Sequence, residues 1–415
     1  MNLQKYGPGL LFAASAVGTS HLVQSTRAGA DYGFALAGVI VLACLLKYPA
    51  FRFGSDYAAA TGRSLVDAYF AIGRWAVIVF LLELVMIMFI VTSALALVSA
   101  GLIQEVLGTQ VDHRLMVAAL LVVSLLLLIA GGYGVFERVS KVVVVLFLVI
   151  IVVATAAVVP DVDVERIYLM PSAAVPVGLT FLIALSGWMP TGIAMAAFQS
   201  LWVSAKRQMT PDLSQAEVRF DFNVGYWGTT VLALCFVVLG TVLMYQPGTE
   251  VANNPTQFAG QLMNLLTAGV GQMMYPLIGL AAVLVMVSSL LTVLDACPRA
   301  LEAVLVDLRA GRREDASSVE RGRFYTPLLL LQCIAAMVVV VFFTASFTGF
   351  LDFATGAAFI TSPFLAYLSL RAMQSDEVPE EARPSKFMVA LSWLGIAVLA
   401  VFSVLFVSRR LMGID

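Results

Sequence analysis

Two polar interruptions in apolar stretches decide the fold of this chain. The first is SAVGTSHLVQST (residues 15–26), in which Gly-Thr-Ser-His at 18–21 interrupts an apolar run that begins at Gly7. The second is SGWMPTG (residues 186–192). A helix broken at membrane depth frees backbone carbonyl and amide groups, which then need a ligand, water or other protein groups as partners. The two interruptions therefore mark the candidate binding site.

The composition is that of an integral membrane protein. Of the 415 residues, 61% are hydrophobic and 12% are charged, and the mean hydropathy is +0.96. A soluble domain has about 25% charged residues. Most apolar runs have about 18 residues or more, which is enough for a helix to cross the hydrocarbon core, whereas barrel strands are shorter and alternate. We predict an all-α membrane protein with about eleven transmembrane helices, at residues 7–30, 33–53, 75–104, 115–132, 139–159, 174–204, 224–245, 270–300, 326–344, 347–370 and 387–408.

The charges in the loops predict the orientation. Short cytoplasmic loops collect Lys and Arg. With the N-terminus inside, the inner segments hold most of these residues, including the basic run 309–323, and the outer ones hold an acidic patch at 161–165. We expect a multi-pass protein of the plasma (inner) membrane with a cytoplasmic N-terminus and an outside C-terminus.

Several classes of function are excluded at this level. The net charge of −2 argues against nucleic-acid binding, and two His and four Cys are too few for a metal cluster or a disulfide framework. No phosphate-binding loop or nucleophile elbow occurs, so we expect no enzyme and no cofactor. The expected partners are a transported ion or small solute and the lipid bilayer. The oligomeric state is open, with a monomer expected.

The two interruptions lie in the first and sixth predicted spans, five spans apart. Breaks at matching positions of two five-helix halves are typical of inverted-repeat secondary transporters, which bind their substrate at the midplane. A single Gly or Pro kink is common in membrane helices, so the pairing carries the prediction. We predict a single transmembrane domain over 1–415, with a first repeat at 7–160, an inverted second repeat at 174–370 and an additional helix at 387–408.

At these and other short motifs the chain resembles the NRAMP family of divalent-metal transporters, which have a LeuT-like fold. The shared motifs are, in chain order, Gly7-Pro8-Gly9-Leu10, Gly29-Ala30-Asp31-Tyr32-Gly33, Glu83, Met189-Pro190, Ser288-Ser289 and Ser362-Pro363-Phe364. The resemblance covers nearly the whole chain. It implies a LeuT-like 5+5 inverted repeat in which helices one and six are broken.

The residues that bind metal in that family differ here. The family's Asp-Pro-Gly-Asn in span one corresponds to Gly18, Thr19, Ser20 and His21, so the acid is absent. The span-six pattern corresponds to Ser186, Met189, Pro190 and Thr191, and a polar span-ten residue corresponds to Thr355. The acidic positions of the family's proton route in span three correspond to Ile90 and Ser93, and the Arg of span nine has no counterpart in 328–343. The resemblance therefore predicts weak or absent proton coupling of the family's kind.

The predicted substrate-binding residues are Ser15, Gly18, Thr19, Ser20, His21, Ser186, Met189, Thr191 and Thr355. Among them, His21 and Met189 are the predicted metal ligands. His21 and Glu83 are the candidates for coupling, because His titrates near physiological pH and a carboxyl group deep in a membrane span is costly without a function. Glu83 either takes up a proton during transport or pairs with an internal donor.

Two further pairs of charged residues are predicted to be structural. Arg27, near the outer end of span one, is expected to pair with Asp31 or to extend toward the interface. Asp295 and Arg299 have the i, i+4 spacing of an ion pair on a helix face.

Three functions remain open from the sequence. The first is alternating-access transport of a divalent metal ion by His21, Met189, freed carbonyls and water, a ligand set that favours softer transition metals. The second is transport of a small organic or anionic solute, for which the free amides from Leu22 onward form a positive helix end. The third is a non-transporting sensor. The resemblance favours the metal ion.

Overall fold

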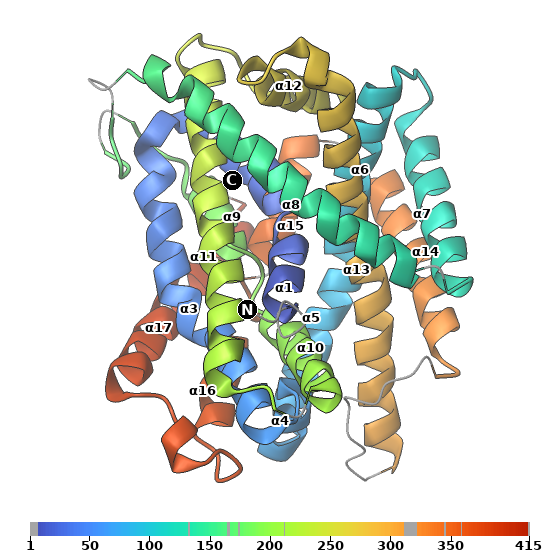
Figure 1. The fold of residues 1–415 in the computed structure, drawn as a ribbon, viewed down its shortest axis with the longest axis vertical. Helices are drawn as coiled ribbons and strands as arrows, with labels where there is room; N and C mark the ends of the chain where they lie inside the picture. Colours follow the sequence, from blue (N-terminus) through green and yellow to red (C-terminus); the bar gives the residue numbers. More distant parts are fainter. Residues whose placement is uncertain are drawn as a thin grey trace.

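The computed structural model describes residues 7–131, 133–163, 167–172, 175–210, 212–310, 322–343, 346–357 and 359–413, and all regular elements in them are helices (Figure 1). The α-helices are α1 (Pro8–Ala16), α2 (Thr26–Tyr32), α3 (Ala37–Thr61), α4 (Leu65–Ile72), α5 (Arg74–Met86), α6 (Thr92–Leu107), α7 (His113–Ile129), α8 (Tyr133–Val158), α9 (Leu179–Trp188), α10 (Met195–Met209), α11 (Gln215–Gly240), α12 (Pro255–Ala268), α13 (Tyr275–Ala310), α14 (Tyr325–Phe343), α15 (Phe347–Ala357), α16 (Ser362–Met373) and α17 (Lys386–Met412). Most of the basic run 309–323 lies outside the described residues.

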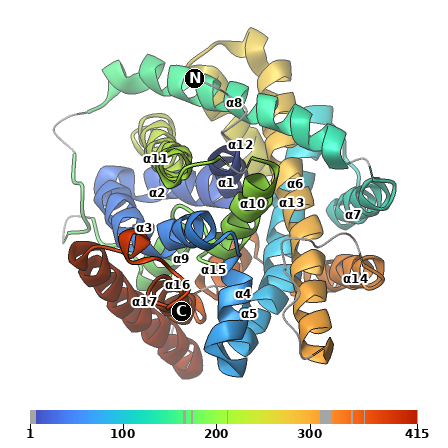
Figure 2. The same cartoon turned by 60° about the horizontal axis from the view of Figure 1, so that its bottom comes forward.

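Helices coincide with all eleven predicted spans. Seven continuous helical stretches of the described chain are long and apolar enough to cross a membrane, and α7, the end of α8, and α9 are shorter apolar helices. Helices α17 on one flank and α7 and α14 on the opposite flank expose large apolar side chains, as expected of a surface that faces lipid (Figure 2). The prediction of an all-helical membrane protein is confirmed.

Both interruptions separate a span into two helices. In span one, α1 ends at Ala16, and a π-helical segment, Ser20–Ser25, leads into α2. In span six, α9 ends at Trp188 and α10 starts at Met195, so the chain between them is not helical. Span ten is also divided, into α15 and α16. The division of the chain into two inverted repeats at 7–160 and 174–370 stays a prediction.

Helix α11 packs along both halves of span one and fixes their positions. Gly9 of α1 and Gly225 of α11 meet so closely that a Cβ atom on Gly225 would lie 2.2 Å from the Gly9 carbonyl oxygen. On α2, a Cβ atom on Gly29 would lie 2.2 Å from the carbonyl oxygen of Val237. Only glycine allows such close contact between the two backbones. Both halves of the broken span therefore rest on one continuous helix.

The N-terminus of α1 is stabilised by a carboxylate from α11. The backbone N–H of Gly9 donates to Asp221 Oδ2 at 2.6 Å, and that of Gly7 reaches the same carboxylate at 3.4 Å. The first amides of a helix lack partners within the helix and carry the positive end of its dipole. Asp221 supplies both the acceptors and the negative charge.

Candidate functional site

A cavity of about 70 Å³ lies at the break in span one. Its walls come from α1, the break that follows it, α5, a second π-helical segment (Ile87–Val91), α6, α9, α10, α13 and the link between α9 and α10. The residues around it are Ser15, Ala16, Gly18, Thr19, Ser20, Glu83, Ile87, Val91, Leu95, Trp188, Thr191, Gly192, Ala194, Met195, Phe198 and Val293. The structure therefore brings together Ser15, Gly18, Thr19, Ser20 and Thr191 of the predicted binding residues, and adds Glu83.

The hydroxyl groups around this cavity can accept contacts from a ligand. Thr19 Oγ1 is buried and has no hydrogen-bond partner among the residues that the structure describes. The hydroxyl of Ser15 donates to the carbonyl of Leu11 at 2.8 Å, and the single hydroxyl proton of Ser20 has two acceptors in reach, the carbonyl of Ala16 at 2.9 Å and Nδ1 of His21 at 2.8 Å. Each of these serine oxygens keeps a lone pair after donating its proton. An unpaired buried oxygen beside a cavity is costly, and a bound cation or a water molecule offsets that cost.

Glu83 supplies the carboxylate of the cavity wall. The residue is only 3% exposed, and the hydroxyl of Thr361 donates a hydrogen bond to its Oε2. The sequence left two roles open for Glu83, proton uptake during transport or pairing with an internal donor. The Thr361 hydroxyl is such a donor, but it is neutral. No ion pair to Glu83 is found among the described side chains. A buried carboxylate without a positive partner favours a proton or a cation nearby.

His21 points toward α11. Its ring is fully buried, with Nε2 3.0 Å from the Thr229 carbonyl oxygen and Nδ1 2.8 Å from Ser20 Oγ. Because a carbonyl oxygen only accepts, Nε2 carries a proton and donates it to Thr229. His21 is absent from the cavity wall in this conformation. Both ring nitrogens are paired within the protein, and the imidazole joins the break in span one to α11.

The remaining predicted residues do not line this cavity. Met189 is fully buried, and its sulfur accepts a hydrogen bond from the Ser25 hydroxyl at 3.7 Å. The Ser186 hydroxyl donates to the carbonyl of Leu182 at 2.7 Å. In this conformation four of the predicted binding residues lie outside the cavity wall, namely Ser186, Met189, His21 and Thr355.

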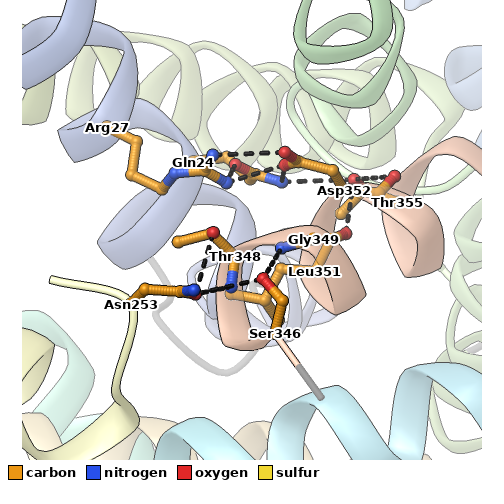
Figure 3. A network of polar contacts seen from close by, with 9 residues as sticks. All are labelled: Gln24, Arg27, Asn253, Ser346, Thr348, Gly349, Leu351, Asp352 and Thr355. Carbon is orange, nitrogen blue, oxygen red and sulfur yellow. Dashed lines mark hydrogen bonds and ion pairs between the residues drawn. The ribbon is translucent and has the colours of Figure 1, made fainter. Parts of the chain in front are cut away.

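Thr355 belongs to a polar network that joins α2 to α15 (Figure 3). Arg27 makes two hydrogen bonds to the carboxylate of Asp352, at 2.7 and 3.2 Å, and its guanidinium stacks over the ring of Phe181. Gln24 accepts from Arg27 at 3.0 Å and donates to Asp352 at 3.1 Å and to Thr355 at 3.2 Å. The network closes the α2 side of the break with a charged pair.

The contacts of Arg27 correct one prediction from the sequence, and those of Arg299 confirm another. The ion pair expected between Arg27 and Asp31 is replaced by the pair with Asp352, because the fold places α15 against the start of α2 and so brings that carboxylate into contact from a distant part of the chain. The predicted pair on α13 is confirmed, with Arg299 Nε 2.8 Å from Asp295 Oδ2.

Lys47 of α3 is a functional candidate that the sequence reasoning missed. It is 2% exposed, and its Nζ donates to the backbone carbonyls of Ser186 at 3.0 Å, Gly187 at 2.8 Å and Thr191 at 3.2 Å. All these carbonyls belong to the break in span six. The available signal was a lysine in the middle of the apolar span 33–53, where a charge is costly.

The family model of natural resistance-associated macrophage protein-like (Nramp) proteins matches residues 9–409. The chain belongs to the Nramp family. A curated relative, an uncharacterized protein of Pasteurella multocida, is 31% identical over 409 residues, which cover 97% of this chain and 92% of the relative.

Solved structures of low sequence identity share the fold of this Nramp protein. A mutant of the Eremococcus coleocola manganese transporter matches with a TM-score of 0.72 and 17% identity, over 99% of this chain and 87% of that chain. Mhp1, a nucleobase-cation-symport-1 family transporter, matches with a TM-score of 0.61 and 14% identity, over 97% of this chain and 90% of that chain. The LeuT-like fold expected from the resemblance is confirmed. The protein is an Nramp-family membrane transporter and not an enzyme.

Proposed function

We propose that this Nramp-family secondary transporter carries a divalent metal ion by alternating access and binds it in the cavity at the break in span one. One observation carries the proposal: Glu83, a buried carboxylate, and Thr19, a buried hydroxyl, line the same cavity, and within the described part of the chain the first has no positive partner and the second no hydrogen-bond partner. A divalent cation satisfies both groups at once. Membership of the Nramp family, and the description of one structural relative as a manganese transporter, support this substrate class.

The oxygen atoms around the cavity favour a hard cation that retains some of its water. Carboxylate, hydroxyl and carbonyl oxygens suit Mn²⁺ and Mg²⁺, whereas imidazole and thioether suit softer transition metals. The metal ligation by His21 and Met189 that the sequence predicts is not part of the proposed site. It requires a second conformation, because the imidazole must first leave Thr229 and the sulfur must turn toward the cavity.

The arrangement supports a conformation that is closed on its outer side. Ser15 of α1 and Met195 and Phe198 of α10 place the cavity on the side of the break that the loop charges assign to the cytoplasm. The pair of Arg27 and Asp352 closes the opposite side. With Ile90 and Ser93 at the positions of the family's acids, Glu83 and His21 remain the proposed coupling residues, and we expect weak proton coupling or none.

The test is Mn²⁺ uptake into proteoliposomes with a trapped fluorescent indicator. Glu83→Gln keeps the size of the side chain but removes its charge, so we expect uptake to fall tenfold or more, equivalent to at least about 1.4 kcal/mol. Glu105→Gln is the matched control, because Glu105 lies on α6, pairs with Tyr275 and is absent from the cavity wall. Wild-type uptake by the Glu83 variant contradicts the proposed site, and no uptake by any form contradicts the metal substrate.

A small organic or anionic solute is the second candidate. The observation in its favour is that the described residues contain no group of three or more His, Cys, Asp and Glu side chains placed to hold a metal ion. A thermal-shift panel separates the candidates, with Mn²⁺, Fe²⁺, Co²⁺, Ni²⁺, Zn²⁺, Cd²⁺ and Mg²⁺ beside small carboxylates and amino acids. Stabilisation by an organic solute alone supports the second candidate.

A further inference from the structure

The carbonyl groups at the break in span six have lost their usual partners. In a continuous helix, the Ser186 carbonyl accepts from the N–H of residue 190, but residue 190 is proline and has no N–H. The Gly187 carbonyl lies in the last turn of α9, where the carbonyls have no partner within the helix and carry the negative end of its dipole. The Thr191 carbonyl lies in the non-helical link.

These carbonyls converge on one ammonium group. Nζ of Lys47 lies 3.0, 2.8 and 3.2 Å from the oxygens of Ser186, Gly187 and Thr191. An ammonium has three protons, so the carbonyls satisfy all of its donors. Within the described residues, the side chain forms no ion pair with a carboxylate. The positive charge is balanced by the carbonyl dipoles alone.

Unwound carbonyls and helix C-termini are the groups with which broken-helix transporters bind Na⁺ or protons. We propose that the carbonyls of Ser186, Gly187 and Thr191 form a monovalent-cation site whose resident cation is the Lys47 ammonium. Lys47 is thus a positioning residue that holds the end of α9 and the link to α10 in place, and a free cation cannot enter while it is bound. The inference does not depend on the identity of the transported substrate.

The surroundings of Lys47 allow a direct test of this site. A largely apolar cavity of about 210 Å³ between α3, α9 and α17 is lined by both Lys47 and Ser186. Lys47→Ala removes the equivalent of n-propylammonium and leaves its space joined to that cavity. A free alkylammonium ion can therefore replace the lost side chain. Lys47→Met fills much of the same space without a charge, so it leaves the carbonyls unpaired and admits no substitute.

The experiment measures the Tm of the purified protein in a metal chelator, so the result is independent of divalent ions. We expect Lys47→Ala to have a lower Tm than the wild type, and n-propylammonium to raise it saturably by about 2 °C or more through preferential binding to the folded state. The neutral isostere 1-propanol and tetramethylammonium, which has no N–H donors, are expected to have no such effect. Wild type, Lys47→Met and the exposed-lysine control Lys386→Ala are expected not to respond.

Two results overturn the inference. One is a wild-type Tm for Lys47→Ala. The other is a rise in Tm with n-propylammonium that is no larger for Lys47→Ala than for the wild type and Lys47→Met. If Lys47→Ala gives no monodisperse protein, the yields of folded Lys47→Arg and folded Lys47→Met are compared instead. A higher yield for Arg supports the cation site, and an equal or higher yield for Met overturns it. Loss of Mn²⁺ uptake in Glu83→Gln bears only on the proposed function.

Discussion

The breaks in spans one and six both free backbone carbonyls that need hydrogen-bond donors, and the two breaks obtain these donors in different ways. In span one, local groups satisfy the free carbonyls: the amides of His21 and Leu22 donate to Gly18, and the amide of Gly18 donates to Ala16. In span six, the carbonyls of Ser186 and Gly187 are satisfied by the charged side chain of a different helix.

The difference assigns separate roles to the two breaks. The neutral break in span one leaves hydroxyl oxygens facing the cavity, where a substrate can reach them. The break in span six already holds a positive charge, which repels a second cation from its carbonyls. We therefore expect the substrate to bind against span one and Glu83, and span six to be held by Lys47.

The largest expected effect comes from removing the charge at span six. Lys47→Met leaves two buried carbonyls and the partly buried carbonyl of Thr191 without their donor, at a cost of about 1–3 kcal/mol for each buried group. We expect a loss of about 3 kcal/mol or more, seen as a large fall in Tm. If the Met variant melts like the wild type, the carbonyls have found other partners and the contrast between the breaks disappears.

A smaller effect is expected at the α2 side of span one. Asp352→Asn keeps the shape of the side chain but weakens both contacts with Arg27, whose side chain is only 8% exposed. We expect a loss of about 2 kcal/mol, below the 3–5 kcal/mol of a fully buried pair because Asp352 is partly exposed. The α2 side of the break should also open more readily. Faster thiol labelling of Thr355→Cys in this background checks that opening, and an unchanged rate argues against closure by this pair.

Substitution of His21 tests whether the metal ion is bound by the groups that line the cavity and not by the imidazole. His21→Leu removes the hydrogen bond to Thr229, so a loss of about 1 kcal/mol is expected. Because the ring does not line the cavity, Mn²⁺ affinity measured by titration calorimetry should change less than threefold. A fall of tenfold or more would instead restore His21 as a metal ligand.

The smallest effect is expected for Met189→Leu. The two side chains have similar volumes, and swaps of this kind in cores usually cost less than about 1.5 kcal/mol. The sulfur accepts only one long hydrogen bond, from Ser25. We expect the relative affinities for Mn²⁺ and Cd²⁺ to stay the same, whereas a selective loss of Cd²⁺ binding identifies the thioether as a ligand.

Sequence reasoning was most successful where the signal was local. Run lengths located the helices, and Gly-Thr-Ser-His and Met-Pro located both breaks. The position of Glu83 deep in an apolar span marked it as a candidate, and it lines the cavity at the break. The i, i+4 spacing identified the pair of Asp295 and Arg299.

The failures involve partners that are distant in the chain. Arg27 has Asp31 nearby, but it binds Asp352, 325 residues away. Lys47 was visible as a charge in an apolar span, yet its partners are backbone carbonyls at least 139 residues away. A carbonyl leaves no mark in the sequence, and only Pro190 indicated that one was free. The orientation of His21 toward α11 likewise depends on packing that a single sequence does not encode locally.

The most direct test of where the substrate binds is an anomalous difference map of crystals grown with Mn²⁺. The account predicts one peak in the cavity lined by Thr19 and Glu83, and none at the carbonyls of Ser186 and Gly187. A peak at those carbonyls with Lys47 displaced, or one between His21 and Met189, contradicts it.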